Sequence, residues 1–65
     1  STPTVRKRSK APEMCDGCTL IIRWYGHPNH EKKMSETRRE NGKITVKNWN
    51  FEGEITKDEV YDIDE

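Results

Sequence analysis

Residues 15–30 read CDGCTLIIRWYGHPNH, and this stretch decides the predicted fold because it holds both cysteines and both histidines of the chain. Cys15 with Cys18, and His27 with His30, form two close pairs in the pattern C-x2-C-x8-H-x2-H. Zinc prefers four tetrahedral nitrogen and sulfur ligands, usually delivered as two such pairs. The spacing therefore predicts a zinc site in which all four side chains bind one ion.

The length and composition of the chain make such a staple necessary. The chain has 65 residues, of which 29% are hydrophobic and 37% are charged. A chain this short and polar forms one domain and buries little core, so it folds only marginally without a metal or another cross-link. Zinc at a site of this kind contributes on the order of 10 kcal/mol to folding. At this length we expect no enzyme and no small-molecule substrate. We also expect no membrane span, because no apolar run approaches ~20 residues.

Two alternatives to one shared ion remain open. If residues 19–25 form an extended strand, the two pairs lie more than about 20 Å apart, so sharing within one chain requires a reversal near Ile22. Ligands would otherwise be used separately or between two chains, although we expect a monomer. The Cys-x-x-Cys pair is also compatible with a disulfide or a redox dithiol, but redox dithiols usually stand at a helix N-terminus on a larger scaffold.

The arrangement of two pairs resembles a zinc ribbon or a compact zinc finger built from two facing knuckles. Cys15, Cys18 and the following Thr19 match the first knuckle of the compact type. The second pair is histidine rather than cysteine here, and the spacer is shorter. The resemblance covers about a quarter of the chain, so no functional residue is carried over from it.

Outward from the cysteines, the sequence favours strands. TLIIRWY, residues 19–25, is rich in β-branched and aromatic residues and predicts a strand. Asn41-Gly42 is typical of a type I′ hairpin turn. Ile44 and Val46 would lie on one face of this hairpin, and the paired residues named next would lie on the other. Strands registered about this turn form two charge pairs and one apolar pair: Glu40 with Lys43, Glu36 with Lys47, and Met34 with Trp49.

A short helix over residues 29–40 is the alternative to the first strand of this hairpin. Pro28 would stand at its beginning and Asn41-Gly42 at its end. Within EKKMSETRRE, however, only Met34 offers an apolar face for such a helix to bury. We therefore prefer the hairpin.

The two ends of the chain carry opposite charge. Residues 1–10 hold four bases and no acid, residues 11–51 hold seven bases and five acids, and residues 52–65 hold seven acids and one base. We expect a flexible basic arm over 1–12, a stapled core over 13–51 and an acidic tail over 52–65. The predicted fold class is a small zinc-stapled, mainly β mini-domain, a knuckle plus a β-hairpin, with disordered ends.

Two binding functions fit this organisation. The first is nucleic-acid binding, because basic residues and aromatics interleave over residues 23–49, although the acidic tail must then be held away from the site. Its candidate residues are Arg6, Lys7, Arg8, Arg23, Trp24, Arg38, Arg39 and Lys47. The second is a regulatory protein-interaction adaptor, in which Trp49 and Phe51 anchor a protein partner. Reduced thiols suit an intracellular location, and the basic arm also fits nuclear import.

Overall fold

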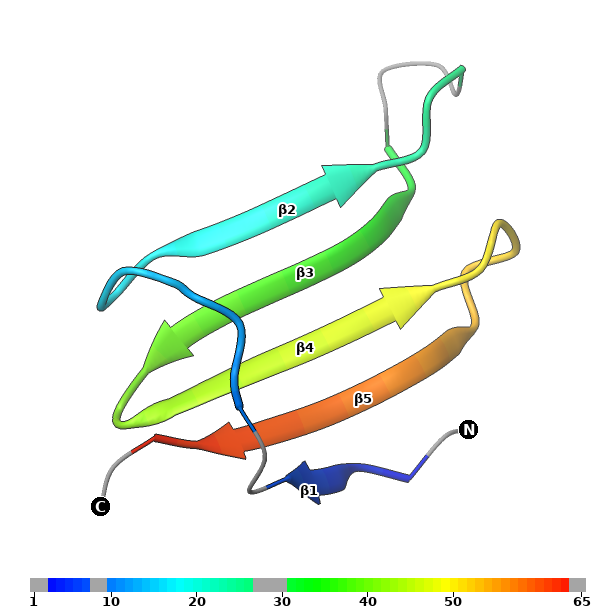
Figure 1. Cartoon of the computed structure of the whole chain (residues 1–65). Helices are drawn as coiled ribbons and strands as arrows, with labels where there is room; N and C mark the ends of the chain where they lie inside the picture. Colours follow the sequence, from blue (N-terminus) through cyan, green and yellow to red (C-terminus); the bar gives the residue numbers. More distant parts are fainter. Residues whose placement is uncertain (1–2, 8–9, 27–30, 64–65) are drawn as a thin grey trace.

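The computed structural model describes residues 3–7, 10–26 and 31–63. These residues form one five-stranded sheet (Figure 1). Its strands are β1 (Val5–Lys7), β2 (Thr19–Arg23), β3 (Lys33–Glu40), β4 (Lys43–Trp49) and β5 (Ile55–Asp62). Their order across the sheet is β1-β5-β4-β3-β2, in which β1 is parallel to β5 and the other neighbours are antiparallel. The mainly β class is confirmed.

The predicted β-hairpin is confirmed around the Asn41-Gly42 turn. These two residues have φ angles of 56° and 71°, as a type I′ turn requires. Glu40 pairs with Lys43, and Glu36 with Lys47, as the sequence predicts. The β3–β4 ladder ends at Ser35 and Asn48, one step before the predicted pair of Met34 with Trp49. Irregularities in the neighbouring ladders lie at this same end of the sheet, between Ile22 and Arg23 and between Asn48 and Trp49.

The alternative helix over residues 29–40 is wrong for residues 33–40, which form β3. A helix there would have had one apolar residue to bury, whereas the strand satisfies its backbone by pairing with β2 on one side and β4 on the other. The predicted strand at TLIIRWY is confirmed over Thr19–Arg23.

Both ends of the chain join the sheet, so the expectation of disorder is wrong for residues 5–7 and 55–62. The basic and acidic segments neutralise each other once they are paired. Arg6 Nε lies 2.7 Å from Asp62 Oδ2, and Lys7 Nζ lies 3.3 Å from Glu59 Oε2. The hydroxyl of Thr4 also donates to the Asp58 carboxylate (3.1 Å). The acidic segment therefore becomes an internal strand, and the basic segment becomes the edge strand beside it.

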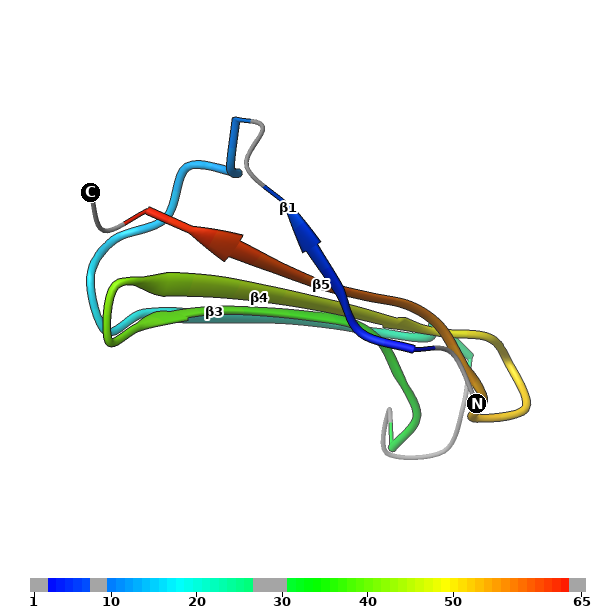
Figure 2. The same cartoon turned by 90° about the horizontal axis from the view of Figure 1, so that it is seen from below.

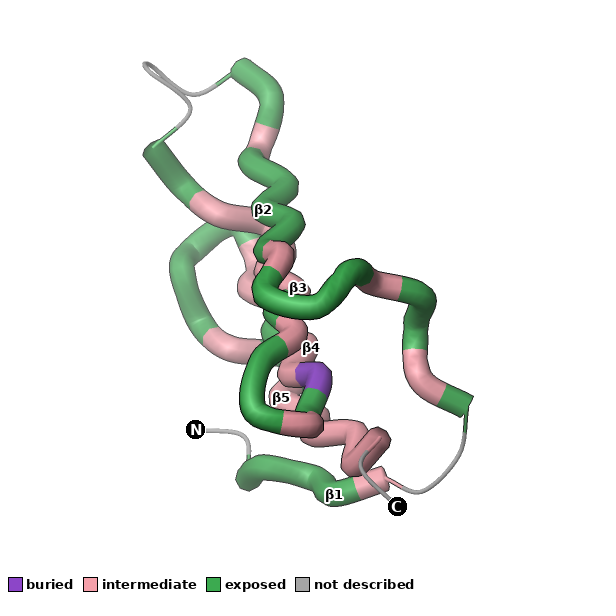
Figure 3. The backbone as a smooth tube through the Cα atoms, turned by 90° about the vertical axis from the view of Figure 1, so that its left-hand side faces the viewer, coloured by how far each residue is buried: buried purple, intermediate pink, exposed green. Residues whose placement is uncertain are grey.

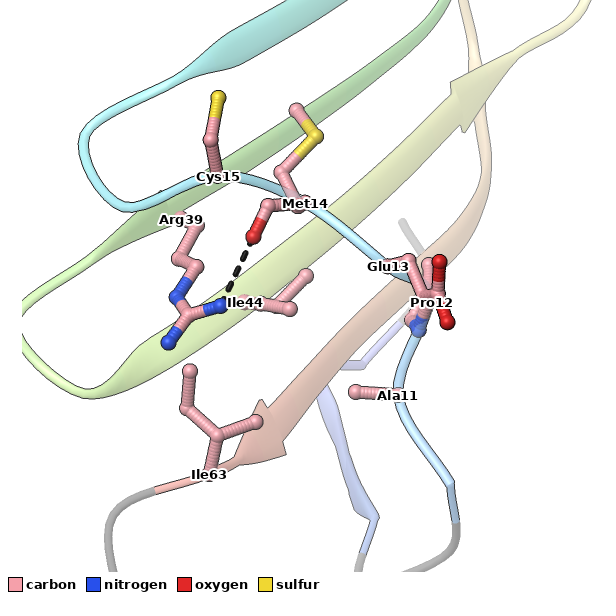
Figure 4. A pocket seen from close by; sticks show the side chains of 8 residues that line it. All are labelled: Ala11, Pro12, Glu13, Met14, Cys15, Arg39, Ile44 and Ile63. Carbon is pink, nitrogen blue, oxygen red and sulfur yellow. Dashed lines mark hydrogen bonds between the residues drawn. The ribbon is translucent and has the colours of Figure 1, made fainter.

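The core of the sheet is small and lies on one face. Ile44 is 1% exposed and is the one fully buried side chain among the described residues (Figure 3). Residues 10–15 cross over this face and cover the sheet near Ile44 (Figures 1 and 2). Arg39 ties this crossing segment to the sheet, because its Nη1 donates to the carbonyl oxygen of Met14 (2.7 Å; Figure 4). The opposite face carries mostly polar and charged side chains, and the register also places Ile21 of β2 and Val60 of β5 on it.

Candidate nucleic-acid interface

The two predicted cysteine ligands lie in the turn that precedes β2. Cys15 and Cys18 are joined by a disulfide in the structure. The turn is anchored to the strand beside it: the Gly17 N–H donates to the Arg39 carbonyl oxygen (2.8 Å), and the Arg39 N–H donates to the Cys18 carbonyl oxygen (3.0 Å). Gly17 permits this geometry because its φ is 78°.

The histidines His27 and His30 lie outside the described residues, within which no three His, Cys, Asp or Glu side chains are grouped as metal ligands would be. The path of β2 bears on whether the two predicted ligand pairs can share one ion within a chain. β2 runs extended without reversing near Ile22, so the Cys15–Cys18 turn lies at one end of β2 and Gly26 follows the other end (Figure 1). Zinc binding therefore stays a prediction from the sequence.

Charged side chains from β3 and β4 line a hollow on the sheet face opposite residues 10–15. Alternation along the strands puts Glu36 and Arg38 on this face, and the register places Lys47 and Thr45 beside them. The hollow has a volume of about 380 Å³. We call it the β3–β4 groove, and its lining residues are Lys33, Glu36, Arg38, Glu40, Thr45, Lys47 and Trp49.

An aromatic ring closes one end of the groove. Lys33 Nζ lies 5.6 Å from the centroid of the Trp49 ring, within cation–π range. The same two residues also line a second hollow of about 310 Å³, with Glu31, Lys32 and Gly53 from the loops at that end. Residues 31–33 bend toward this side of the sheet, away from the face that residues 10–15 cover (Figure 2). The two hollows together make a path along β3 and β4 that passes Trp49.

Glu36 organises the basic side chains within the groove. Its carboxylate lies 3.0 Å from Lys33 Nζ and 2.8 Å from Arg38 Nη2. The hydrogen bond from Lys33 lowers the pKa of the Glu36 carboxyl below its usual value. Burial opposes this shift, while the charges of Lys33, Arg38 and Lys47 add to it. Three cations thus surround one carboxylate.

The positive charge of the chain is concentrated on the half of the sheet that holds the groove. Residues 19–49 contain seven bases and three acids. On the other half, Arg6 and Lys7 of β1 neutralise Asp62 and Glu59 of β5. Asp58 and Asp62 do share the groove face, opposite Lys47 and Lys43, but Asp62 is already held by Arg6. The basic arm therefore pairs with two of the five acids in residues 52–63, and Asp58 stays on the groove face.

The structure brings together only part of the predicted nucleic-acid set. Arg38 and Lys47 lie in the groove, and Arg23 pairs in register with Lys33 at its edge. Arg39 points to the opposite face, where Met14 holds it, and Arg6 and Lys7 are engaged with β5. Arg8 lies outside the described residues.

The predicted aromatic residues also separate. Trp24 packs edge-on against Phe51, with ring centroids 5.7 Å apart, and its indole nitrogen is buried. Phe51 is 53% exposed, and Lys32 Nζ lies 5.6 Å from its ring centroid. Trp49, predicted as a protein anchor, lines the groove instead. Trp49 rather than Trp24 is therefore the tryptophan placed beside the basic side chains.

Sequence reasoning missed Thr45 as a groove residue, and it counted Lys33 among the basic residues without placing it on this face. The predicted hairpin could have identified Thr45, because alternation puts it on the same face as Lys47. The hairpin does not predict the face of Lys33, because the register shift between Ile22 and Arg23 decides it.

Comparisons with known proteins add no family assignment. The chain matches no protein-family model, and neither the curated proteins nor the solved structures give a match. The described part of the chain holds no helix long and apolar enough to cross a membrane.

Proposed function

We propose that this protein binds single-stranded nucleic acid in the β3–β4 groove, without catalysing a reaction. Lys33, Arg38 and Lys47 would contact phosphates, and Trp49 would stack on a base. The observation that supports the proposal is the clustering of these three cations beside an aromatic ring on an uncovered sheet face. An open sheet face with bases and aromatics is a common platform for single strands.

The dimensions of the groove favour one strand over a duplex. Neighbouring strands of a sheet lie about 4.8 Å apart, so the cations of β3 and β4 form one narrow track. A narrow track follows a single phosphodiester backbone, and stacking on Trp49 requires a base that is not already paired within a duplex.

Removing two groove cations is expected to weaken binding strongly. Arg38 and Lys47 are both exposed, so the double substitution Arg38→Gln with Lys47→Gln should leave the fold intact. We expect the affinity for a fluorescein-labelled oligothymidylate of about 12 nucleotides to fall on the order of tenfold at low salt. The slope of log affinity against log salt should also become shallower by about 1.4, from about 0.7 for each lost phosphate contact. Fluorescence anisotropy at several salt concentrations measures both quantities.

The matched control is Lys57→Gln, which removes an exposed lysine from the opposite face of the sheet. It should bind like the unmodified chain. An equal loss of log affinity per removed charge in Lys57→Gln and in the double variant would mean that charge alone attracts the oligonucleotide, and the groove would then have no special role.

Substitution of Glu36 should act in the opposite direction. Glu36→Gln keeps the shape of the side chain but releases Lys33 and Arg38 for phosphate, so binding should tighten.

Lowering the pH should have the same effect on the unmodified chain. The pKa of Glu36 is lowered in the folded state. The Glu36 carboxylate therefore contributes fully to stability above its unfolded-state pKa, and this contribution is lost as the pH falls through its folded-state pKa. Binding should tighten over that same interval, and should not do so in Glu36→Gln.

We propose zinc binding separately, on the spacing of Cys15, Cys18, His27 and His30. Native mass spectrometry of the reduced chain, with and without chelator, tests it. Zinc that binds the reduced chain and is lost on chelation is the expected result. One zinc per two chains would move the ligands to an interface between copies, and a metal-free chain under reducing conditions would refute zinc binding.

A protein-interaction role is the second candidate. Phe51 is 53% and Tyr25 is 92% exposed at the end of the sheet where the β2–β3 and β4–β5 connections lie. Exposed aromatic residues are frequent anchors of protein interfaces. Salt distinguishes the two roles, because phosphate contacts weaken steeply with ionic strength and apolar contacts do not.

A further inference from the structure

β2 is an edge strand whose outer side has no neighbour among the described residues (Figure 1). It pairs with β3 on its inner side alone. Its three central side chains are apolar and solvent-exposed: Leu20 is 53%, Ile21 is 37% and Ile22 is 44% exposed. An exposed apolar edge offers unpaired N–H and C=O groups to another strand, and proteins ordinarily protect such edges with charge, proline or a covering segment.

The two edges of this sheet are protected unequally. β1, at the far edge, has three residues, of which Arg6 and Lys7 are charged and paired with β5. β2 contains no acid, no lysine and no proline, and its one charge, Arg23, lies at its last position. The β2 edge is therefore the side of the sheet at which another strand can pair.

We propose that two copies of this chain pair along β2, antiparallel and centred on Ile21, to form one continuous sheet. In this register Ile21 lies opposite Ile21 of the second copy. Leu20 lies opposite Ile22 of the second copy, and Thr19 lies opposite Arg23 of the second copy. Apolar side chains thus meet apolar ones at the three central positions, and no like charges are opposed. A parallel pairing in register would instead place the two Arg23 side chains next to each other, which is unfavourable.

The pairing would be weak and would leave the β3–β4 groove open. A five-residue edge buries less than the roughly 1,200 Å² at the lower end of standard stable interfaces, so we expect a dissociation constant in the micromolar range or weaker. In an antiparallel pair, opposed residues point to the same side of the sheet, so the grooves of both copies face the same way. This inference does not depend on nucleic-acid binding, because self-association is measured without an oligonucleotide.

Sedimentation velocity of the full chain, over about 1 to 500 µM, tests the pairing. We expect the sedimentation coefficient to rise with concentration from the monomer value toward the dimer value. Ile21→Lys should abolish that rise, because it places two ammonium groups opposite each other at the centre of the pair. Thr56→Lys, which introduces lysine at an exposed position of β5, should dimerise like the unmodified chain. Circular dichroism confirms that the variants are folded. A monomer throughout, or undiminished dimerisation of Ile21→Lys, would overturn the proposal.

Cross-linking tests the register itself. With Ile21→Cys, oxidation should link two chains through position 21, because the two Cβ atoms of an opposed pair are about 5 Å apart. With Thr19→Cys, the introduced thiols should not link to each other, since about 13 Å of strand separates them in this register. Peptide mapping identifies which sulfurs are joined and separates these links from any made by Cys15 or Cys18. Preferential linkage at position 19 would overturn the proposed register.

Discussion

A chain that ends at Glu54, without β5, is expected to lose cooperative unfolding altogether. β5 lies between β4 and β1 and pairs with β4 from Lys43 to Trp49. Its removal leaves β1 without a neighbour and takes Tyr61, the residue opposite Ile44, away from the core. A three-stranded remnant with its one buried side chain uncovered has too little apolar contact to fold stably. Urea denaturation followed by far-ultraviolet circular dichroism measures the loss.

The control for this truncation is Thr56→Ala in the full chain. Thr56 is exposed on β5, so its replacement should move the urea midpoint little. If the truncated chain kept the same cooperative transition as the full chain, residues 55–62 would be a dispensable tail, as their composition alone suggests.

The substitution Ile44→Ala is expected to destabilise the protein by about 2 to 5 kcal/mol. Ile44 is 1% exposed, and it lies where residues 10–15 cover the sheet. Small domains are at the low end of the usual range of about 5 to 15 kcal/mol of stability, so the variant should be largely unfolded at room temperature. Chemical denaturation, with the sheet signal read by circular dichroism, gives the difference in unfolding free energy.

Val5→Ala provides the matched control for the core substitution. Val5 is also β-branched and lies in a strand, but it is 47% exposed. Its truncation should cost less than about 1 kcal/mol, because most of its surface stays in water in the folded state. Equal costs for the two substitutions would mean that the core is not centred on Ile44.

The β3–β4 hairpin was predictable because its determinants are local. Asn41-Gly42 specifies the turn type, and the turn fixes the register that pairs Glu36 with Lys47. β2 was predictable for a similar reason, since Leu20, Ile21 and Ile22 have strong β-propensity. In each case a few neighbouring residues carry the information.

The pairing of the two ends was not predictable from composition. Arg6 and Asp62 stand 56 residues apart, and each segment alone has the charge bias of a disordered chain. Only their contact cancels the like-charge repulsion within each segment. β1 and β5 complete the sheet whether or not the chain also binds zinc, which stays a prediction.

The candidate site was predictable in part. Arg38 and Lys47 followed from residue type, and the hairpin register placed Glu36 between them. The distinction between Arg38 and Arg39, which point to opposite faces, required knowing that these residues are in a strand rather than a helix. The approach of Lys33 to Trp49 depends on register shifts in the adjoining ladders, which the sequence pattern does not reveal.

The parallel pairing of β1 with β5 has a consequence for how the chain folds. Val5 is matched with Glu59, so this contact closes a loop that includes nearly the whole sequence. Forming such a contact has a large loop-closure entropy, and a high contact order slows folding. During synthesis the hairpin can form early, but the sheet is complete only after residue 62 has left the ribosome. Folding is therefore expected to finish after translation of this segment, with the β4 edge exposed until then.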